Sequence, residues 1–114
     1  LLLTARELGK LGLLALRGGC WEGQQVVPAA YLRQAMTKQV DAGGPNPKAG
    51  GYGFLWWIAT DGTPYMAGQG GQYVVIHADL DMVAVITGRD TPDIDYNGLF
   101  HLVAEGVSGT ATGP

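Results

Sequence analysis

The sequence is short of charged residues. Asp, Glu, Lys and Arg make up 15% of its 114 residues, whereas about 25% is usual in a soluble domain. Few charges leave few solvated faces, so we expect part of the surface to be covered by further protein. The net charge of −3 provides no basic patch and argues against a nucleic-acid partner. No apolar run in the sequence approaches the ~20 residues that a membrane-spanning helix needs.

Residues typical of disulfide and metal sites are also scarce. Cys20 is the only cysteine and cannot form a disulfide within the chain, so we interpret it as a small, partly buried apolar residue. His77 and His101 lie far apart in the sequence without other ligands around them, and we expect neither a metal site nor a cofactor. Asp93–Gly98 imitates the start of a calcium-binding loop, but Ala104 stands where the glutamate ligand should be. Nothing in the composition indicates a cellular compartment.

What is present suffices for a core, because hydrophobic residues make up 46% of the sequence. Near the N-terminus, Thr4 and Glu7 have the spacing of a capping box, which predicts a helix over residues 5–17. Gly9 and Gly12 would weaken this helix in isolation, so we expect them to allow close packing against a neighbouring element. The complete prediction is helices at 5–17 and 28–39, a loop at 41–51, strands at 52–59, 72–78 and 82–88, and a helix at 95–107.

These elements predict an α+β fold. Short turns between the strands favour an antiparallel sheet of about three strands, with the N- and C-terminal helices packed on one face. The other face would be covered by sequence outside this chain or by a second copy. The strands at 72–78 and 82–88 are apolar on alternate and intervening positions, which indicates that both of their faces are covered. Trp56 and Trp57 should point to opposite faces of their strand, with at least one of them in the core.

The candidate binding segment is Gln69-Gly70-Gly71-Gln72, directly before an apolar strand. Glycine at the start of a strand lets a ligand approach the bare backbone, so this segment could bind a substrate. The alternative is a glycine-rich turn or bulge that is needed only for backbone shape.

In their order, these pieces resemble the C-terminal portion of the serine hydrolases related to class C β-lactamases, penicillin-binding proteins and esterases. Residues 3–28 resemble a helix, turn and second helix of that family, and residues 52–57 resemble its Tyr-Gly-x-x-Trp-Trp strand. Residues 68–88 resemble its last strand pair. The resemblance implies a partial β-lactamase/transpeptidase-like fold, with residues 1–114 as a single C-terminal portion of that domain. It also implies a longer polypeptide, of which this is the interior and later part.

The family's chemistry uses a Ser-x-x-Lys nucleophile motif, a Tyr-x-Asn motif and a Lys-Thr-Gly or His-x-Gly segment on a strand. Ser108 is the only serine here, and Gly109-Thr110-Ala111 follow it, so Ser-x-x-Lys is absent. No tyrosine has asparagine two residues later. The third motif survives only as Gln69-Gly70-Gly71-Gln72, without lysine or histidine.

The resemblance therefore implies a fragment that supplies one wall of an active site. The implied binding residues are Gln69, Gly70, Gly71 and Gln72, and the chain itself contributes no catalytic residue. Its implied partners are the N-terminal part of the same polypeptide and a small-molecule acyl substrate, and the isolated chain should tend to self-associate. The alternative is a non-catalytic binding or assembly module that reuses the fold.

Overall fold

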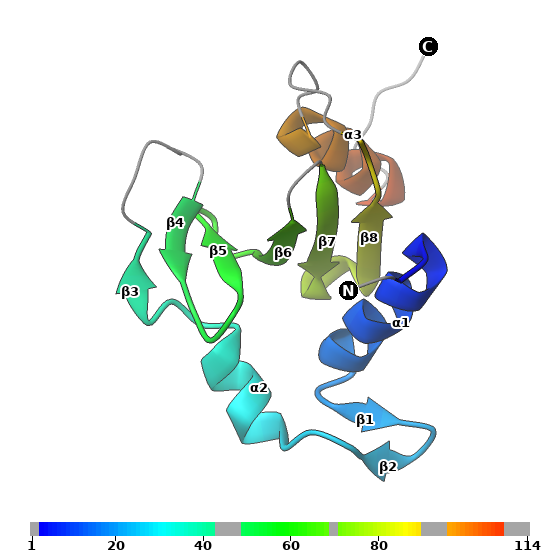
Figure 1. Ribbon diagram of the computed structural model, residues 1–114, viewed down its shortest axis with the longest axis vertical. Helices are drawn as coiled ribbons and strands as arrows, with labels where there is room; N and C mark the ends of the chain where they lie inside the picture. The colour runs from blue at the N-terminus through cyan, green and yellow to red at the C-terminus, as the bar shows by residue number, and fades with distance from the viewer. Residues whose placement is uncertain (1–2, 43–48, 69–70, 90–95, 109–114) are drawn as a thin grey trace.

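The computed structural model describes residues 3–42, 49–68, 71–89 and 96–108. Its larger sheet contains six strands in the order β3-β4-β5-β6-β7-β8, and each strand pairs antiparallel with the next (Figure 1). The elements are α1 (Ala5–Leu16), β1 (Cys20–Trp21), β2 (Gln24–Gln25), α2 (Ala29–Ala35), β3 (Val40–Asp41), β4 (Ala49–Tyr52), β5 (Trp57–Ala59), β6 (Pro64–Gly68), β7 (Gln72–His77), η1 (Ala78–Leu80), β8 (Met82–Ile86) and α3 (Tyr96–Ser108). The α+β class is confirmed, but the prediction of about three strands is wrong.

The structure has more strands than the sequence predicted, and the difference arises mainly in two segments, the strand expected at 52–59 and the loop expected at 41–51. The strand expected at 52–59 is interrupted after β4, because the Gly53 N–H donates to the Trp56 carbonyl at 2.7 Å and Leu55 has a φ of 66°. β3 begins at Val40, one residue before the loop expected at 41–51, and β4 lies within that loop except for Tyr52. β6 (Pro64–Gly68) lies between the strands expected at 52–59 and 72–78, where no strand was predicted.

The helix expected at 28–39 ends early, at Ala35. Its last carbonyl, that of Ala35, accepts a hydrogen bond from the Phe54 N–H at 3.0 Å rather than from a later helical N–H. The Gln39 N–H donates instead to the Tyr52 carbonyl at 3.0 Å, which leads into the pairing of β3 with β4. Hydrogen bonds with residues 52 and 54 thus end α2, and the sequence of the helix itself does not reveal them. The helix at the N-terminus, in contrast, begins with the predicted capping box between Thr4 and Glu7.

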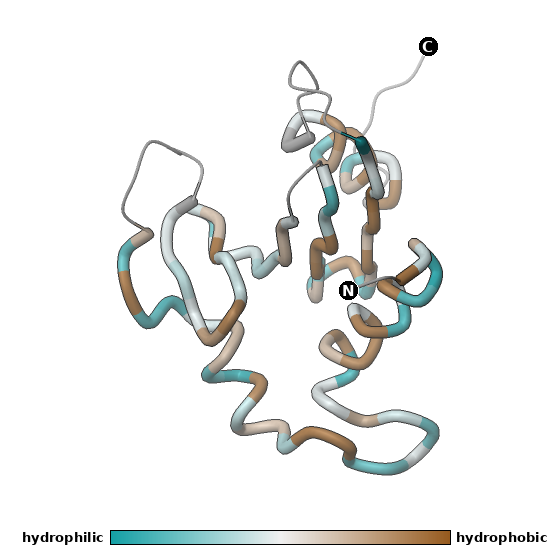
Figure 2. Tube along the Cα trace, viewed as in Figure 1, coloured by the Kyte–Doolittle hydropathy of each residue, from teal (hydrophilic) through white to brown (hydrophobic). Residues whose placement is uncertain are grey.

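The core lies between α1, the loop around Trp56 and the central strands. Its buried members are Ala15, Ala35, Trp56, Ile58, Val74 and Ile76. Trp56 is therefore the core tryptophan, as predicted for one of the pair, whereas Trp57 is half-buried and packs edge-on against Tyr52 with ring centroids 4.8 Å apart. In Figure 2 the apolar residues of α1 and β8 lie side by side along one flank of the molecule.

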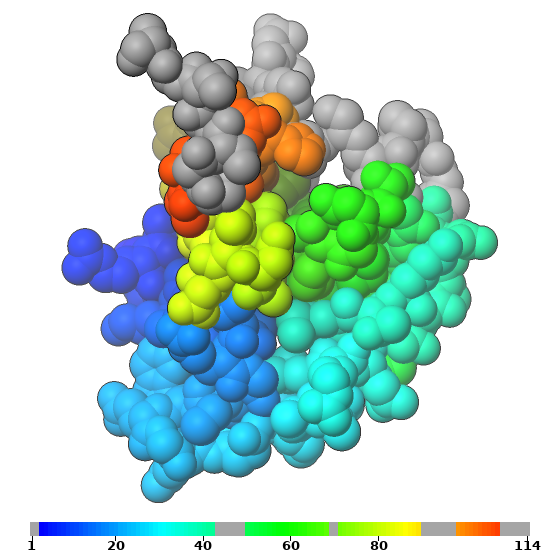
Figure 3. Space-filling model, turned by 180° about the vertical axis from the view of Figure 1, so that it is seen from behind, coloured from blue at the N-terminus to red at the C-terminus, as the bar shows by residue number. Residues whose placement is uncertain are grey.

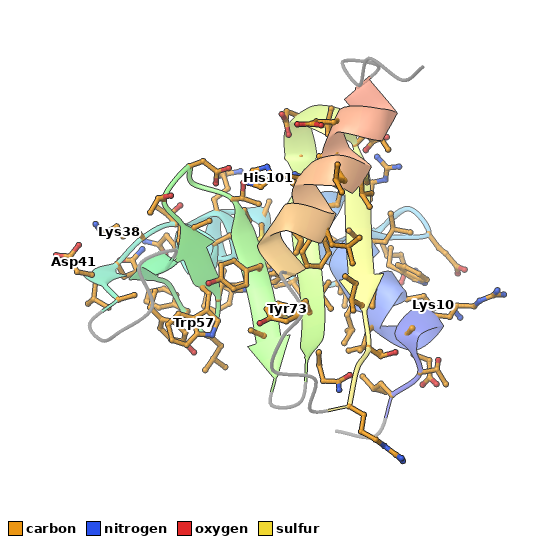
Figure 4. The ribbon with its side chains drawn as sticks, turned by 90° about the horizontal axis from the view of Figure 1, so that it is seen from above. Lys10, Lys38, Asp41, Trp57, Tyr73 and His101 are labelled. Atoms are coloured by element: carbon orange, nitrogen blue, oxygen red, sulfur yellow. The ribbon has the colours of Figure 1, made fainter. Side chains whose placement is uncertain are left out.

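The two terminal helices pack on opposite faces of β7 and β8, so the prediction that they share one face is wrong (Figure 4). On one face, a Cβ built on Gly12 of α1 would lie 2.5 Å from Val83 Cγ1 and 3.0 Å from Val74 Cγ1. On the other face, Phe100 of α3 packs edge-on against Tyr73, with ring centroids 6.0 Å apart. The coverage of both faces predicted from the apolar strands is thus achieved by one helix on each side. Among the described residues, no helix has the length and hydropathy that a membrane crossing requires.

Candidate binding site at the hairpin between β6 and β7

The predicted binding segment lies at the end of the hairpin that joins β6 to β7. Gly68 and Gln72 are the last residue pair of this hairpin, and Gly71 between them has a φ of 91°. That conformation favours glycine, because a side chain is strained there. Gln69 and Gly70 lie outside the described residues. The sequence therefore placed Gly71 and Gln72 correctly at the start of a strand, and their role in binding stays a prediction.

Gln72 holds this end of the sheet together. Its side-chain amide nitrogen donates a hydrogen bond to the carbonyl of Gly88, beyond the end of β8. The contact is partly buried and joins the start of β7 to the segment that follows β8. The side-chain N–H of Gln72 is thus engaged within the protein, which makes Gln72 a positioning residue for the hairpin whatever else it contacts.

An apolar groove of about 500 Å³ adjoins the same hairpin. Gly68 and Gln72 form its edge nearest the glycine segment, and Leu8 of α1 contributes from the neighbouring helix. The full lining consists of Leu3, Leu8, Met66, Ala67, Gly68, Gln72, Tyr73 and Val74. No charged side chain lines this groove within the described part of the chain, so it is suited to the apolar part of a ligand.

A second, smaller pocket lies between α3 and the sheet. It has a volume of about 60 Å³, and its lining includes both His77 of β7 and His101 of α3. His101 is labelled in Figure 4. The sequence did not predict this meeting, since one histidine lies on a strand and the other on a distant helix. His77 Nε2 is buried and has no hydrogen-bond partner within the described residues. A cavity of this size has room for water, which can bond to such a group.

Two groups around this pocket, Tyr65 and Asp61, are poorly suited to act as bases. Burial, and to a lesser degree the neighbouring Tyr73, raises the pKa of the Tyr65 hydroxyl, so Tyr65 stays protonated at neutral pH. A hydrogen bond from the Thr63 backbone N–H, 2.9 Å from Asp61 Oδ1, lowers the pKa of the Asp61 carboxyl. Asp61 is therefore a weak base that already accepts a structural hydrogen bond. Across the described ranges, no group of three or more His, Cys, Asp or Glu residues could hold a metal ion.

The other candidate residues lie elsewhere. Cys20 is half-buried in β1 and free, as its interpretation as a partly buried apolar residue requires. Ser108 is the last residue of α3. The first three residues of the acidic stretch Asp93–Gly98 lie outside the described residues, and α3 begins at Tyr96.

Comparison with known proteins gives a structural match. No protein-family model matches the sequence, and no curated protein matches it. A solved structure from Bacillus anthracis, named "Putative 6-aminohexanoate-dimer hydrolase", matches with a TM-score of 0.73 at 26% sequence identity. The match covers 93% of this chain and 29% of the Bacillus anthracis protein. The chain thus spans less than a third of the length of the protein that it matches.

The match extends over nearly the whole chain, as the sequence resemblance does. It therefore confirms that resemblance. The chain therefore has the fold of a portion of the Bacillus anthracis protein, which is a β-lactamase/transpeptidase-like fold.

Proposed function

We propose that this chain is the C-terminal part of a β-lactamase-like serine hydrolase, in which it forms the strand wall of the active site. The observation that carries the proposal is the glycine hairpin between β6 and β7, which closes at Gly68 and Gln72 beside an apolar groove. A hairpin of this kind presents backbone N–H groups without side chains in front of them. Such groups can donate hydrogen bonds to the oxygen of a carbonyl under attack.

The chemistry of acyl transfer determines which groups this chain would supply and which would come from the rest of the polypeptide. Acyl transfer needs an activated nucleophile, which the family supplies as the serine of Ser-x-x-Lys, and this motif is absent from the 114 residues. The nucleophile would belong to the rest of the polypeptide, and its oxygen would attack the substrate carbonyl. The segment Gln69–Gln72 would stabilise the oxyanion that forms, the leaving group would depart with a proton, and water would then hydrolyse the acyl-enzyme.

The groove beside the hairpin suggests the kind of substrate. Leu3, Leu8, Met66 and Val74 would surround an apolar acyl chain, while the carbonyl carbon lies toward the glycine segment. The name of the Bacillus anthracis protein refers to a dimer of an amino acid, which is a linear amide. We therefore favour a small linear amide or ester as the substrate class. β-Lactams and peptides are the other substrates that the family resemblance allows.

A serine-directed fluorophosphonate tests the proposal. The probe should label the product of the open reading frame that contains these residues, and it should leave the 114-residue chain unlabelled. A Gln69→Pro variant of the longer protein lacks the backbone N–H and should lower kcat/KM, whereas Gln69→Ala keeps that N–H and should leave kcat/KM nearly unchanged. Gln72→Ala tests the hairpin instead, because loss of its bond to Gly88 should lower the melting temperature. Absence of labelling in the longer protein would refute the hydrolase.

One observation favours a second candidate, a binding or assembly module without catalysis. Gln69 stands where the family's third motif would have lysine or histidine, so a cationic group is missing from the wall. The module predicts that the longer reading frame also lacks Ser-x-x-Lys. Sequencing that frame discriminates between the two candidates before any assay is run.

A further inference from the structure

The pocket between α3 and the sheet has the composition of a binding site for a small organic cation. Its lining includes three aromatic rings, those of Tyr65, Tyr73 and Phe100, and the carboxylate of Asp61. Within the described part of the chain, no lysine or arginine side chain contributes to it. Aromatic rings attract cations to their faces, and a carboxylate beside them can serve as the counter-ion. This composition favours an alkylammonium group over an anion.

The pocket is closed on its inner side and opens to solvent on the other. Val75 and Phe100 are buried, with 6% and 7% of their surface exposed, whereas Asp61 and His101 are exposed. Figure 3 shows α3 (orange to red) at the molecular surface, next to the green residues around β5. The volume of about 60 Å³ is several times the roughly 10–15 Å³ that one water molecule needs. A group of a few non-hydrogen atoms can therefore enter past Asp61 and His101.

The aromatic part of the lining adds no charge of its own. The rings of Tyr73 and Phe100 have centroids 6.0 Å apart and stand at 69° to one another. Burial, and to a lesser degree the nearby Tyr73, raises the pKa of the Tyr65 hydroxyl, so this phenol stays neutral. Among the described residues that line the pocket, Asp61 is the only acidic one. The lining is therefore suited to a ligand with a single positive charge.

Two polar groups of the lining can accept hydrogen bonds from such a ligand. Asp61 Oδ1 accepts one from the Thr63 backbone N–H at 2.9 Å, but a carboxylate has about four acceptor positions. His77 Nε2 is buried and has no hydrogen-bond partner within the described residues, and an unpartnered buried polar atom destabilises a protein. An ammonium group only donates hydrogen bonds, so it suits a carboxylate and a ring nitrogen that acts as an acceptor.

We propose that this pocket binds a small organic ammonium ion, of which methylammonium is the simplest. Asp61 is the counter-ion, the three aromatic rings form the walls, and His77 Nε2 accepts a hydrogen bond. The inference is independent of the proposed function, because neither Gly71 nor Gln72 lines the pocket. Water could occupy the same space, and a titration distinguishes the two occupants.

Histidine-ring NMR spectra test the proposal, because His77 and His101 are the only two histidines of the chain and both line the pocket. Methylammonium chloride should shift the ring resonances of both residues and saturate in the millimolar range, which is the affinity that so few atoms allow. Methanol, which is of the same size and uncharged, should shift neither, and nor should sodium chloride at equal ionic strength. The 114-residue chain and the product of the longer open reading frame are titrated in parallel.

Two pairs of variants identify the groups that bind. Asp61→Asn should weaken methylammonium binding at least about tenfold, because hydrogen bonds to charged groups are the stronger ones. Asp79→Asn is the matched control, since it removes the same charge from an exposed residue of η1 that does not line the pocket. Tyr65→Leu should weaken binding about threefold, whereas Tyr65→Phe keeps the ring and should bind like the parent. Circular dichroism establishes that each variant is folded.

Three results would overturn the proposal. Equal shifts with methanol, or equal losses in the two aspartate variants, would show that the charge of Asp61 is not recognised. Absence of a saturable shift would leave water as the occupant. Binding to the short chain but not to the longer protein would show that the rest of the polypeptide fills the pocket.

Nα-acetyl-lysinamide separates two sources of the ammonium group. If it also saturates both histidine shifts, the pocket accepts a lysine side chain. If methylammonium alone does so, the ligand is a free amine. Either result supports an ammonium site at Asp61.

Discussion

Two glycines on α1 give opposite predictions for the same substitution. In both cases alanine should favour the helix itself by about 1 kcal/mol relative to glycine. A Cβ on Gly9 would lie 3.8 Å from Val85 Cγ2, which is an ordinary van der Waals contact. A Cβ on Gly12 would lie 2.5 Å from Val83 Cγ1 and 3.0 Å from Val74 Cγ1. Gly9→Ala should therefore stabilise the protein, and Gly12→Ala should not.

The size of the effect follows from the packing. Val83 and Val74 lie on the paired strands β8 and β7, so their methyl groups cannot retreat without moving the sheet or α1. Forcing an extra methyl group into such a site costs about 1–3 kcal/mol. After the helical gain, Gly12→Ala should lower the free energy of unfolding by roughly 0–2 kcal/mol. Gly9→Ala should raise it by about 1 kcal/mol, so the two variants should differ by about 1–3 kcal/mol.

Urea unfolding followed by far-ultraviolet circular dichroism measures both variants, with an unchanged m-value as the requirement for comparison. The double variant Gly12→Ala/Val83→Ala provides the cycle that isolates the clash. Removing the valine methyl groups should make Gly12→Ala more favourable than it is in the parent protein, by about 1 kcal/mol or more. If Gly12→Ala stabilises as much as Gly9→Ala, α1 does not pack on β7 and β8 in the way described.

Three further variants test other parts of the fold. Gly53→Ala would bring its Cβ within 2.0 Å of the Ala35 carbonyl oxygen in α2, and calorimetry should show a loss of more than about 3 kcal/mol in the free energy of unfolding. Gly106→Ala is the control, because its Cβ would have nothing within 4 Å, and it should be neutral or stabilising. Phe100→Ala should cost about 3 kcal/mol and reduce helicity by detaching α3, whereas Leu102→Ala, 65% exposed on the same helix, should change little. A backbone N–H lowers the pKa of Asp61 below 3.8, so this carboxylate stabilises the fold fully above about pH 4 and loses its effect as pH falls through the lower, folded pKa. Asp61→Asn should cost less than about 1 kcal/mol at pH 7, because the site is exposed and screened. In denaturant unfolding, the free energies of unfolding of the variant and the parent should converge near pH 2, where the carboxyl is protonated.

The parts of the fold that the sequence predicted are those with local signals. The capping box between Thr4 and Glu7 is formed within one helical turn, and it fixed the start of α1 correctly. β7 and β8 are centred on the apolar runs at 73–76 and 82–86, and both strands were expected within two residues of their observed ends. In each case the residues that determine the element lie inside it or beside it.

The parts that failed depend on distant partners. The strand expected at 52–59 includes β5, but the break before β5 depends on the hydrogen bond from the Gly53 N–H to the Trp56 carbonyl. β6 begins with a proline, so it has no pattern that marks a strand before its neighbours are in place. Both faces of β7 are apolar, so the sequence could not say which helix covers which face. His77 and His101 share a pocket only because α3 crosses the sheet, and no spacing along the chain encodes that crossing.

The chemistry of the candidate site is also difficult to predict from the sequence. Its proposed contribution to catalysis consists of backbone N–H groups, which every residue except proline supplies. Side-chain identity at Gln69 and Gln72 therefore says little about whether the wall works, and the absence of lysine or histidine does not decide between hydrolase and binding module. The sequence constraint falls instead on size and conformation, as in Gly71 with its φ of 91° and in Gly68, whose Cβ would lie 3.3 Å from that of Gln72. A wall of this kind is recognised by its hairpin and by what faces it, so the nucleophile in the rest of the polypeptide carries the decisive information.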